Sequence, residues 1–429
     1  MCNYSRMTTI DKLYARVSWR LLPFLFLCYV VAYLDRVNVG FAKLQMQADL
    51  HLSDTVYGLG AGIFFIGYFL LEVPANLLML RVGARRWIAR IMASWGLVSA
   101  AMLFTSSPAS FYAMRFLLGA AEAGFFPGVI MYLTYWYPAR RRARIVAIFM
   151  SGVAVAGVVG GPLSGWIMSH CAGHAGLAGW QWLFLLEGLP AVALGVLTLA
   201  CLDDGIDDAN WLNDEEKALL KNELAGDGAP RSQWALGHVF GSSRVWILAL
   251  VYFLFVMGLY GVGFWLPQLI RNTGVQDVLD IGLLTAIPYG IAAVAMVLAA
   301  RHSDRTGERR WHAALAAFIG AAGLLASTHY ANDPVLALAA LSVATAGILS
   351  TFPVFWSIPT AMLGGSAAAA GIAMINSLGN LAGFLSPYLV GAIKDATHST
   401  ANGMLLIAAS LTMGGVLILL CVGRKGEML

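Results

Sequence analysis

Charged residues are scarce in this sequence. Asp, Glu, Lys and Arg together make up 12% of the 429 residues, while hydrophobic residues make up 59%. A soluble domain usually carries about 25% charged residues, roughly twice the fraction found here. The shortage of charge argues against a soluble protein, and it makes the placement of the few charged residues informative.

Features of several other protein classes are also missing. There is no G-x-x-x-x-G-K-[ST] loop, so we do not expect transport driven by ATP. The segment "HCAGH" at 170–174 offers only three metal-type ligands in a glycine-rich loop, and we expect neither a bound metal nor any other cofactor. The five cysteines are odd in number and scattered, which argues against a disulfide framework; they are Cys2, Cys28, Cys171, Cys201 and Cys421.

Long apolar runs fill most of the chain. A helix needs about 20 apolar residues to cross the hydrocarbon core of a bilayer. The runs do not alternate as the strands of a membrane barrel would, and the first is too long for the core of a cleavable signal peptide, so we expect it to remain as the first span. The sequence predicts an all-α membrane protein with twelve transmembrane helices, near residues 21–41, 57–79, 88–106, 110–136, 145–169, 182–202, 246–269, 280–300, 311–329, 335–357, 367–392 and 403–422.

Basic residues lie almost entirely on one side of this predicted topology. Of the 27 Lys and Arg, 22 fall in the termini and in the loops of one face and two lie inside spans. Only three fall on the other face: Lys43, Arg271 and Lys394. Because Lys and Arg are retained on the cytoplasmic side, both termini are expected in the cytoplasm of a multi-pass inner (plasma) membrane protein. The basic clusters then act as topology signals, and we expect no nucleic-acid partner.

One long polar segment divides the chain. It contains "WLNDEEKALLKNELAGDG", in which Asn213 is predicted to cap a short amphipathic helix. We therefore predict an N-terminal six-helix half at 1–202, a cytoplasmic linker at 203–244 and a C-terminal six-helix half at 245–429, within a monomer. Paired six-helix halves are typical of secondary transporters that bind their substrate between the halves.

A few charged residues lie inside the predicted spans, all of them in the first half. Asp35, Arg36, Arg115 and Glu122 are the clearest cases. A charge at the centre of a span costs about 2.5–3.5 kcal/mol, so such residues usually face the bundle interior, form pairs and mark a functional site. Glu72 and Glu187 fall nearer the span ends, and we assign them structural roles.

The two arginines are expected at a similar depth on different helices, because Arg36 and Arg115 both lie outward of the centre of their spans. Two guanidinium groups at one depth could hold a carboxylate by paired hydrogen bonds. The alternative is a static network in which Asp35 pairs with Arg115 and Glu122 pairs with Arg36.

Several motifs make the chain resemble the major facilitator superfamily over nearly its whole length, and within it the anion:cation symporter family. The motifs are "YLDRVNVGFA" in span 1, "RFLLGAAEAGFFPGVIMYLTYWYP" in span 4, "YGVGFWLPQLI" in span 7 and "INSLGNLAGFLSPYLVGAIKDAT" in span 11. The resemblance implies proton-coupled import of a small organic carboxylate: a sugar acid, a hydroxy acid or an aromatic acid. Import against export stays open, an organic-anion antiporter or exporter is the main alternative, and a non-transporting membrane sensor is a further one.

The resemblance also implies roles for individual residues. Asp35 and Glu122 correspond to proton-coupling carboxyls, with the dominant one left open, and Arg36 and Arg115 correspond to substrate ligands. The loop "SDRTGERR" supplies a gating motif at Asp304, Arg305 and Gly307; its counterpart "LRVGARR" has Arg81, Gly83 and Arg85 but carries Leu80 where the family has an acid. Further candidate substrate ligands, which could equally pack in the helix walls, are Tyr29, Tyr33, Asn38, Tyr260, Trp356, Asn376 and Asn380.

Overall fold

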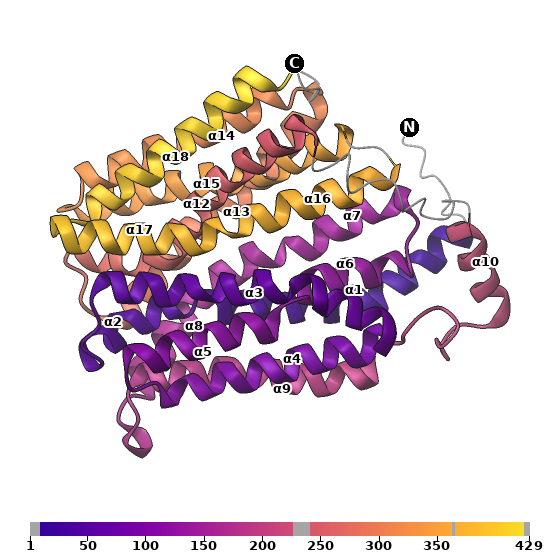
Figure 1. Cartoon of the computed structure of the whole chain (residues 1–429), viewed down its shortest axis with the longest axis horizontal. Helices are drawn as coiled ribbons and strands as arrows, with labels where there is room; N and C mark the ends of the chain where they lie inside the picture. Colours follow the sequence, from indigo (N-terminus) through magenta and orange to yellow (C-terminus); the bar gives the residue numbers. More distant parts are fainter. Residues whose placement is uncertain (1–8, 226–240, 363–364, 424–429) are drawn as a thin grey trace, which may run out of the picture.

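The computed structural model describes residues 9–225, 241–362 and 365–423, and these residues form helices and turns without a strand. Figure 1 shows the helices running side by side along the length of the molecule. Their bounds are α1 Thr9–Val37, α2 Val39–Asp49, α3 Asp54–Val82, α4 Ala84–Ala101, η1 Met102–Phe104, α5 Pro108–Glu122, α6 Phe125–Thr134, α7 Ala139–Met150, α8 Gly152–His170, η2 His174–Gly176, α9 Gly179–Cys201, α10 Asp214–Ala225, α12 Ser243–Asn272, α13 Val278–Thr306, α14 Arg310–His329, α15 Pro334–Met362, α16 Gly365–Asn380, α17 Ala382–Thr397 and α18 Thr400–Cys421.

Eleven helical segments in the described part of the chain are long and apolar enough to cross a membrane. Three of them join two consecutive α-helices, α1 with α2, α5 with α6 and α7 with α8, and a fourth joins α4 with η1. The predicted span at 367–392 is not one uninterrupted helix, because it is divided at Leu381 between α16 and α17, each of 16 residues. The two run in line in Figure 1, and together they have the length that the bilayer requires.

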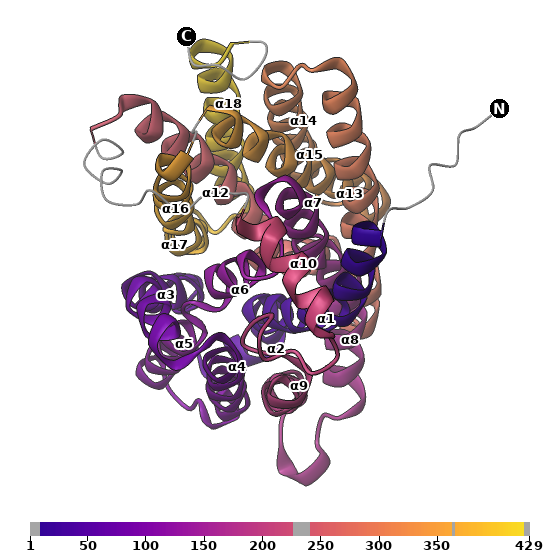
Figure 2. The same ribbon diagram turned by 90° about the vertical axis from the view of Figure 1, so that its right-hand side faces the viewer.

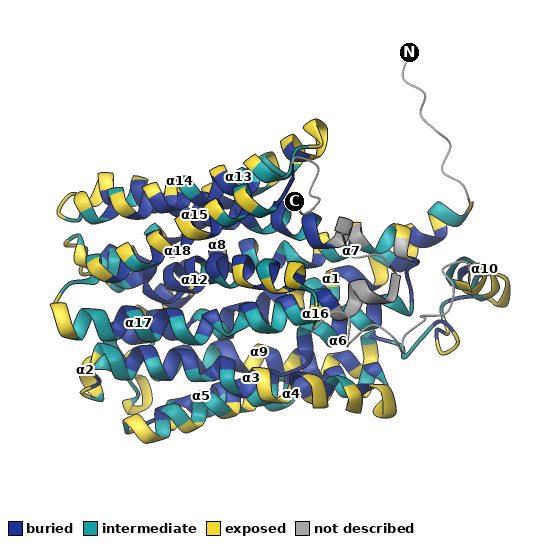
Figure 3. Ribbon diagram, turned by 45° about the horizontal axis from the view of Figure 1, so that its top comes forward, coloured by how far each residue is buried: buried dark blue, intermediate teal, exposed yellow. Residues whose placement is uncertain are grey.

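Many large apolar side chains point outward. Leu70, Val294, Leu298 and Leu420 are each more than half exposed. Figure 3 shows exposed residues along the outward sides of the helices and buried residues on the sides that face other helices. An apolar surface of this kind is stable against lipid and unstable against water, which agrees with the predicted membrane location.

The helices form two groups that meet along their length: the first group contains α1 to α9 and the second contains α12 to α18. Figure 2 shows α3, α4, α5 and α9 on one side and α14, α15 and α18 on the other. The groups approach closely where α8 meets α13: a methyl group at Gly161 would overlap the backbone of Gly282, and the reverse also holds. Small residues permit such close contact between helices.

We call the end of the bundle that carries the start of α1, the end of α18 and helix α10 the terminal face, and the other end the opposite face (Figure 1). On the terminal face α10 packs against the first group of helices. Arg16 pairs with Glu216, Arg140 pairs with Glu223, and the Trp211 ring stacks on Trp136 with 5.9 Å between centroids. The hydrogen bond from Arg16 lowers the pKa of Glu216 below its ordinary value.

The start of α10 confirms the predicted helix cap. The side-chain oxygen of Asn213 accepts a hydrogen bond of 2.8 Å from the backbone N–H of Glu216, and the Glu216 carboxylate accepts one of 3.1 Å from the backbone N–H of Asn213. This reciprocal arrangement satisfies two N–H groups at the end of the helix. Residues 226–240 of the predicted linker lie outside the described residues.

Candidate functional site

Arg36 forms the centre of the charged cluster inside the bundle. It lies on the last turn of α1, and its guanidinium pairs with Glu122, the last residue of α5. Its Nη1 also donates a 3.2 Å hydrogen bond to the hydroxyl of Tyr260 on α12. The Phe64 and Tyr68 rings of α3 lie 5.3 Å and 5.4 Å from its Cζ atom. One side chain therefore contacts both groups of helices and has aromatic rings beside it.

The chain is interrupted immediately after Glu122. Ala123 leaves the helical conformation, and Gly124 has a φ of 86° before α6 begins at Phe125. Glycine adopts positive φ without a steric penalty, so the sequence can end α5 here. The carboxyl of Glu122 thus sits at a break between two half-length helices, the kind of position where transporters place substrate and ion sites.

Arg115 has a different environment. It is fully buried, its Nη2 donates to the carbonyl of Ala61 at 3.1 Å, and its Nε donates to the carbonyl of Gly60 at 3.4 Å. Its Cζ atom lies 5.1 Å from the Phe64 centroid, so both arginines approach the same ring. The two guanidinium groups thus share Phe64 as a neighbour but have different partners: Arg115 donates to backbone carbonyls of α3, while Arg36 pairs with Glu122 and keeps 12% of its side chain exposed.

The static network would require an ion pair between Asp35 and Arg115, and the described structure does not have this pair. The two Asp35 oxygens accept hydrogen bonds from Trp95 Nε1 at 2.9 Å and from Ser99 Oγ at 2.8 Å, both on α4. The Glu122–Arg36 half of that network is present. Asp35 points into the first group of helices and Arg36, the next residue, points toward the second, because consecutive helical residues face about 100° apart.

Among the aromatic candidates, Tyr260 contacts the charged cluster, Tyr29 and Trp356 pack against further rings, and Tyr33 packs mainly against aliphatic side chains. Tyr29 stacks on Phe149 with centroids 4.4 Å apart, and Trp356 meets the Tyr252 ring edge-on at 4.8 Å. Tyr33 is buried in a small cluster with Val30, Leu34 and Ala156.

Asn376 and Asn380 lie half-buried on the last turns of α16. Between them, Ser377 Oγ donates to the Glu72 carboxylate on α3 at 3.1 Å. Glu72 therefore connects the two groups of helices, a contact that its position near a span end did not reveal.

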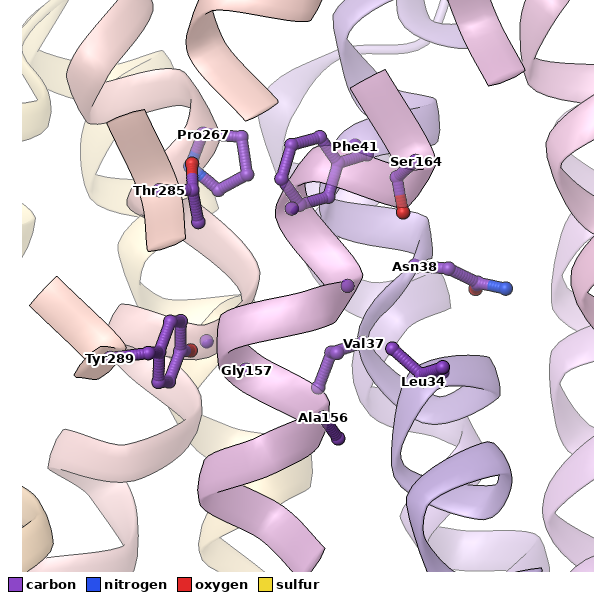
Figure 4. A pocket seen from close by; sticks show the side chains of 13 residues that line it. Leu34, Val37, Asn38, Phe41, Ala156, Gly157, Ser164, Pro267, Thr285 and Tyr289 are labelled. Carbon is purple, nitrogen blue, oxygen red and sulfur yellow. The ribbon is translucent and has the colours of Figure 1, made fainter. Parts of the chain in front are cut away.

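Asn38 lines a pocket between α1, α8, α12 and α13. Figure 4 shows its amide on the same side of the pocket as the hydroxyl of Ser164, with Thr285 and Tyr289 on the side formed by α13. The other lining side chains are apolar or glycine. The pocket lies between the two groups of helices, where the halves of a transporter separate.

Three basic residues close the opposite face, and they are the three that the charge count placed on that side. Lys43 Nζ lies 2.7 Å from Asp54 Oδ1, and Lys394 Nζ from the second group of helices lies 3.0 Å from Asp54 Oδ2. Arg271 Nη1, also from the second group, donates to the carbonyl of Leu44 at 2.7 Å.

Further contacts complete this closure. Asp395 accepts hydrogen bonds from the backbone N–H groups of Asp54 at 3.1 Å and Thr55 at 2.8 Å. The ring of Trp265 lies 3.4 Å from Lys43 Nζ. We call Lys43, Asp54, Lys394 and Asp395 the opposite-face cluster. Sequence reasoning missed it, although the isolation of three basic residues on one side was a usable signal.

The loop motif between α3 and α4 has its acid supplied from elsewhere. Gly83 has a φ of 94°, and the backbone N–H of Arg85 donates to Asp204 Oδ1 at 2.9 Å. Asp204 lies just after α9, and its carboxylate contacts the start of α4. It supplies the acidic group that Leu80 of the loop motif lacks. Negative charge at a helix N-terminus is favourable. The Arg81 side chain is exposed.

The loop between α13 and α14 keeps its own acid. Asp304 pairs with Arg309 at 2.6 Å, and Gly307 has a φ of 66° at the end of α13. Arg305 is exposed. The acid of this loop therefore contacts Arg309 and not the neighbouring Arg305 of the motif.

The family model described as Major Facilitator Superfamily matches residues 25–387. The chain belongs to this superfamily. It is 49% identical over 407 residues to a putative tartrate transporter of Agrobacterium vitis, covering 94% of this chain and 90% of that protein. It is 47% identical over 409 residues to the putative metabolite transport protein NicT of Pseudomonas putida, covering 95% and 94%. A crystal structure of a D-xylose-proton symporter superposes with a TM-score of 0.76 at 17% identity, over 96% and 99% of the two chains, and shows the same fold.

These matches confirm the predicted superfamily and the predicted all-α membrane fold. The chain is a multi-pass membrane transporter of a small molecule and not an enzyme. The Arg36–Glu122–Tyr260 contact joins the two groups of helices in this transporter.

Proposed function

We propose that this transporter imports a small organic carboxylate together with protons across the inner membrane by alternating access. It works as a monomer, uses the proton gradient and no cofactor, and has its terminal face in the cytoplasm. The observation that carries the proposal is the contact of Arg36 with both Glu122 and Tyr260. A planar guanidinium matches the two oxygens of a carboxylate, and here it is already paired with a carboxyl that can exchange places with a substrate.

The exchange couples the substrate to the proton. When Glu122 is ionised it occupies Arg36, and a second carboxylate is repelled. When Glu122 takes a proton, its pairing with Arg36 weakens and the guanidinium is free for the substrate. The loaded site then holds one positive and one negative charge, so closing it away from water costs less free energy than closing an unpaired charge.

A screen of purified protein tests the substrate class. Tartrate, gluconate and benzoate represent a hydroxy acid, a sugar acid and an aromatic acid, and each is compared with its uncharged amide or alcohol by thermal shift. The most stabilising acid is then followed in proteoliposomes under an inward proton gradient. Accumulation supports import, while gradient-driven release of the same acid from the vesicles supports the antiporter or exporter alternative.

Cysteine labelling tests the orientation. In a variant whose native cysteines are replaced by serine, single cysteines at Ala48 and Asn332 should react with an impermeant maleimide added to intact cells. A cysteine at Asp208, beside α10, should react only after the membrane is opened. All three positions are exposed, so accessibility of the side chain is not limiting. Labelling of Asp208→Cys in intact cells would reverse the proposed orientation.

The opposite-face cluster should hold the transporter closed on the periplasmic side. Asp54→Asn removes the carboxylate that Lys43 and Lys394 share, and we expect the open population at that face to rise about tenfold, or about 1.4 kcal/mol. Spin labels at Ala48 and Gln276, on the two groups of helices, report the change as a longer distance by pulsed EPR. Asp280→Asn removes an exposed acid near that face, and it should leave the distance unchanged. Equal distance distributions in the two variants would contradict a closing role.

A further inference from the structure

A second buried carboxyl lies in the first group of helices, away from Arg36. Glu187 on α9 is 4% exposed, and its Oε1 accepts a 2.8 Å hydrogen bond from Ser164 Oγ on α8. Asn38, at the junction of α1 and α2, lines the same pocket as Ser164, and Asp35 lies on the last turn of α1. Four helices, α1, α4, α8 and α9, thus surround a layer that contains two carboxyls, Asp35 and Glu187.

The described donor to Glu187 is the neutral hydroxyl of Ser164 on α8. Asn38 on the same pocket is also neutral, and Asp35 on the last turn of α1 is a further acid. Among the described residues, no cation forms an ion pair with Glu187 or Asp35. The cations inside this half of the bundle are engaged elsewhere: Lys43 with Asp54, Arg36 with Glu122, and Arg115 with backbone carbonyls.

This environment accommodates a neutral carboxyl better than an ionised one. An unpaired charge in a dry interior costs several kcal/mol, and hydrogen bonds from neutral groups offset only a part of that. Two carboxylates in one layer would also repel each other. A purely structural contact to Ser164 would not need an ionisable residue, since glutamine can accept the same hydrogen bond.

The structure also connects Glu187 to the interface that moves. Ser164 and Asn38 both line the pocket between the two groups of helices (Figure 4). The Ser164 hydroxyl, which lines the pocket, donates directly to the Glu187 carboxyl, so this hydroxyl lies between Glu187 and the pocket. Separation of α8 from α13 would bring water to Ser164, and a proton could then pass between this water and Glu187.

We propose that Glu187 is a proton-coupling carboxyl in addition to those assigned above, loaded through Ser164 from the pocket, so that at least two protons move with each substrate molecule. The inference rests on the proposed proton-coupled transport and adds a residue to it. Only a proton moves in this step: it leaves water in the pocket, binds a Glu187 oxygen, and returns to water when the halves have changed position.

The ratio of protons to substrate tests the proposal. Proteoliposomes are held at zero membrane potential, and a known pH difference is imposed across the membrane. The measurement is the steady-state accumulation of tartrate, gluconate or benzoate, whichever binds most tightly. Each coupled proton multiplies accumulation tenfold per pH unit of gradient, because one pH unit is equivalent to a tenfold change in an equilibrium. Glu187→Gln should therefore accumulate tenfold less per pH unit than the wild type, while substrate-for-substrate exchange without a gradient continues.

Matched variants separate coupling from structure. Ser164→Ala keeps the Glu187 carboxyl and removes its hydrogen bond, so this variant should take up substrate more slowly but keep the wild-type dependence of accumulation on the pH gradient. Glu187→Asp keeps a titratable group and should also keep this dependence. A Glu187→Gln protein with the wild-type dependence would overturn the proposal. If Glu187→Gln does not fold, the wild-type protein and Glu187→Asp still test the proposal. A ratio of one proton per substrate in the wild type overturns the proposal, and a Glu187→Asp variant whose accumulation depends on the pH gradient as in the wild type supports it. A wild-type protein without any proton-driven accumulation would instead refute the proposed function and this inference together.

Discussion

Replacing Arg36 by lysine is expected to weaken binding of a carboxylate by about 10- to 100-fold although the positive charge is kept. Lysine cannot offer two parallel N–H groups to one carboxylate, and a hydrogen bond to a charged group contributes about 1.5–3 kcal/mol. In the structure, Arg36 uses one nitrogen for Glu122 and another for Tyr260, so a lysine would also lose one of these partners. Isothermal titration of the purified variant with the acid found in the screen measures the change.

Arg115→Lys is the matched control. Arg115 is fully buried and donates to two backbone carbonyls of α3, so we expect its loss to lower the melting temperature before it lowers affinity. Tyr260→Phe tests the second contact of Arg36, and it should weaken binding less than Arg36→Lys does. If Arg36→Lys bound the acid as tightly as the wild type, Arg36 would not be the carboxylate ligand.

The sequence predicted the helices better than it predicted their contacts. Apolar runs near 20 residues are required by the thickness of the bilayer, so composition alone located the spans. The division of the predicted span 367–392 at Leu381 was not predictable in this way, because an apolar composition is compatible with both a continuous and an interrupted helix. The break at Ala123–Gly124 had a local signal in its glycine.

The contacts of the charged residues depend on which helices become neighbours. The sequence indicated that Asp35, Arg36, Arg115 and Glu122 face the interior, since the membrane excludes lone charges. It could not show that Asp35 would meet Trp95 and not Arg115, because that depends on how α4 packs against α1.

The same limit applies to the loop acid and to the opposite face. Asp204 reaches the start of α4 only because α9 ends beside it. Asp54 pairs with Lys43 of the preceding helix α2 and also with Lys394 of α17, which is distant in the sequence. In each case the residue type was visible in the sequence, and the partner was fixed by long-range packing.

Glu122→Gln is expected to lower accumulation against a gradient by about tenfold per pH unit while leaving exchange intact. Glutamine resembles protonated glutamic acid in shape and cannot ionise, so it leaves Arg36 free for the substrate in both orientations of the transporter. The variant should bind the acid at least as tightly as the wild type, and it should catalyse counterflow between equal concentrations on the two sides. Under an inward proton gradient, its accumulation should be about tenfold lower per pH unit than that of the wild type if Glu122 is the carboxyl that occupies Arg36.

Two comparisons make this result specific. Asp35→Asn changes the other carboxyl of the cluster, whose partners are Trp95 and Ser99 and not Arg36; it should reduce the dependence on the pH gradient without the gain in affinity that freeing Arg36 produces. Asp280→Asn, an exposed acid distant from the cluster, should behave as the wild type. Undiminished proton-driven accumulation by Glu122→Gln would show that the Arg36–Glu122 pair holds the bundle together without taking part in coupling. The protons would then have to pass through the layer formed by Asp35 and Glu187.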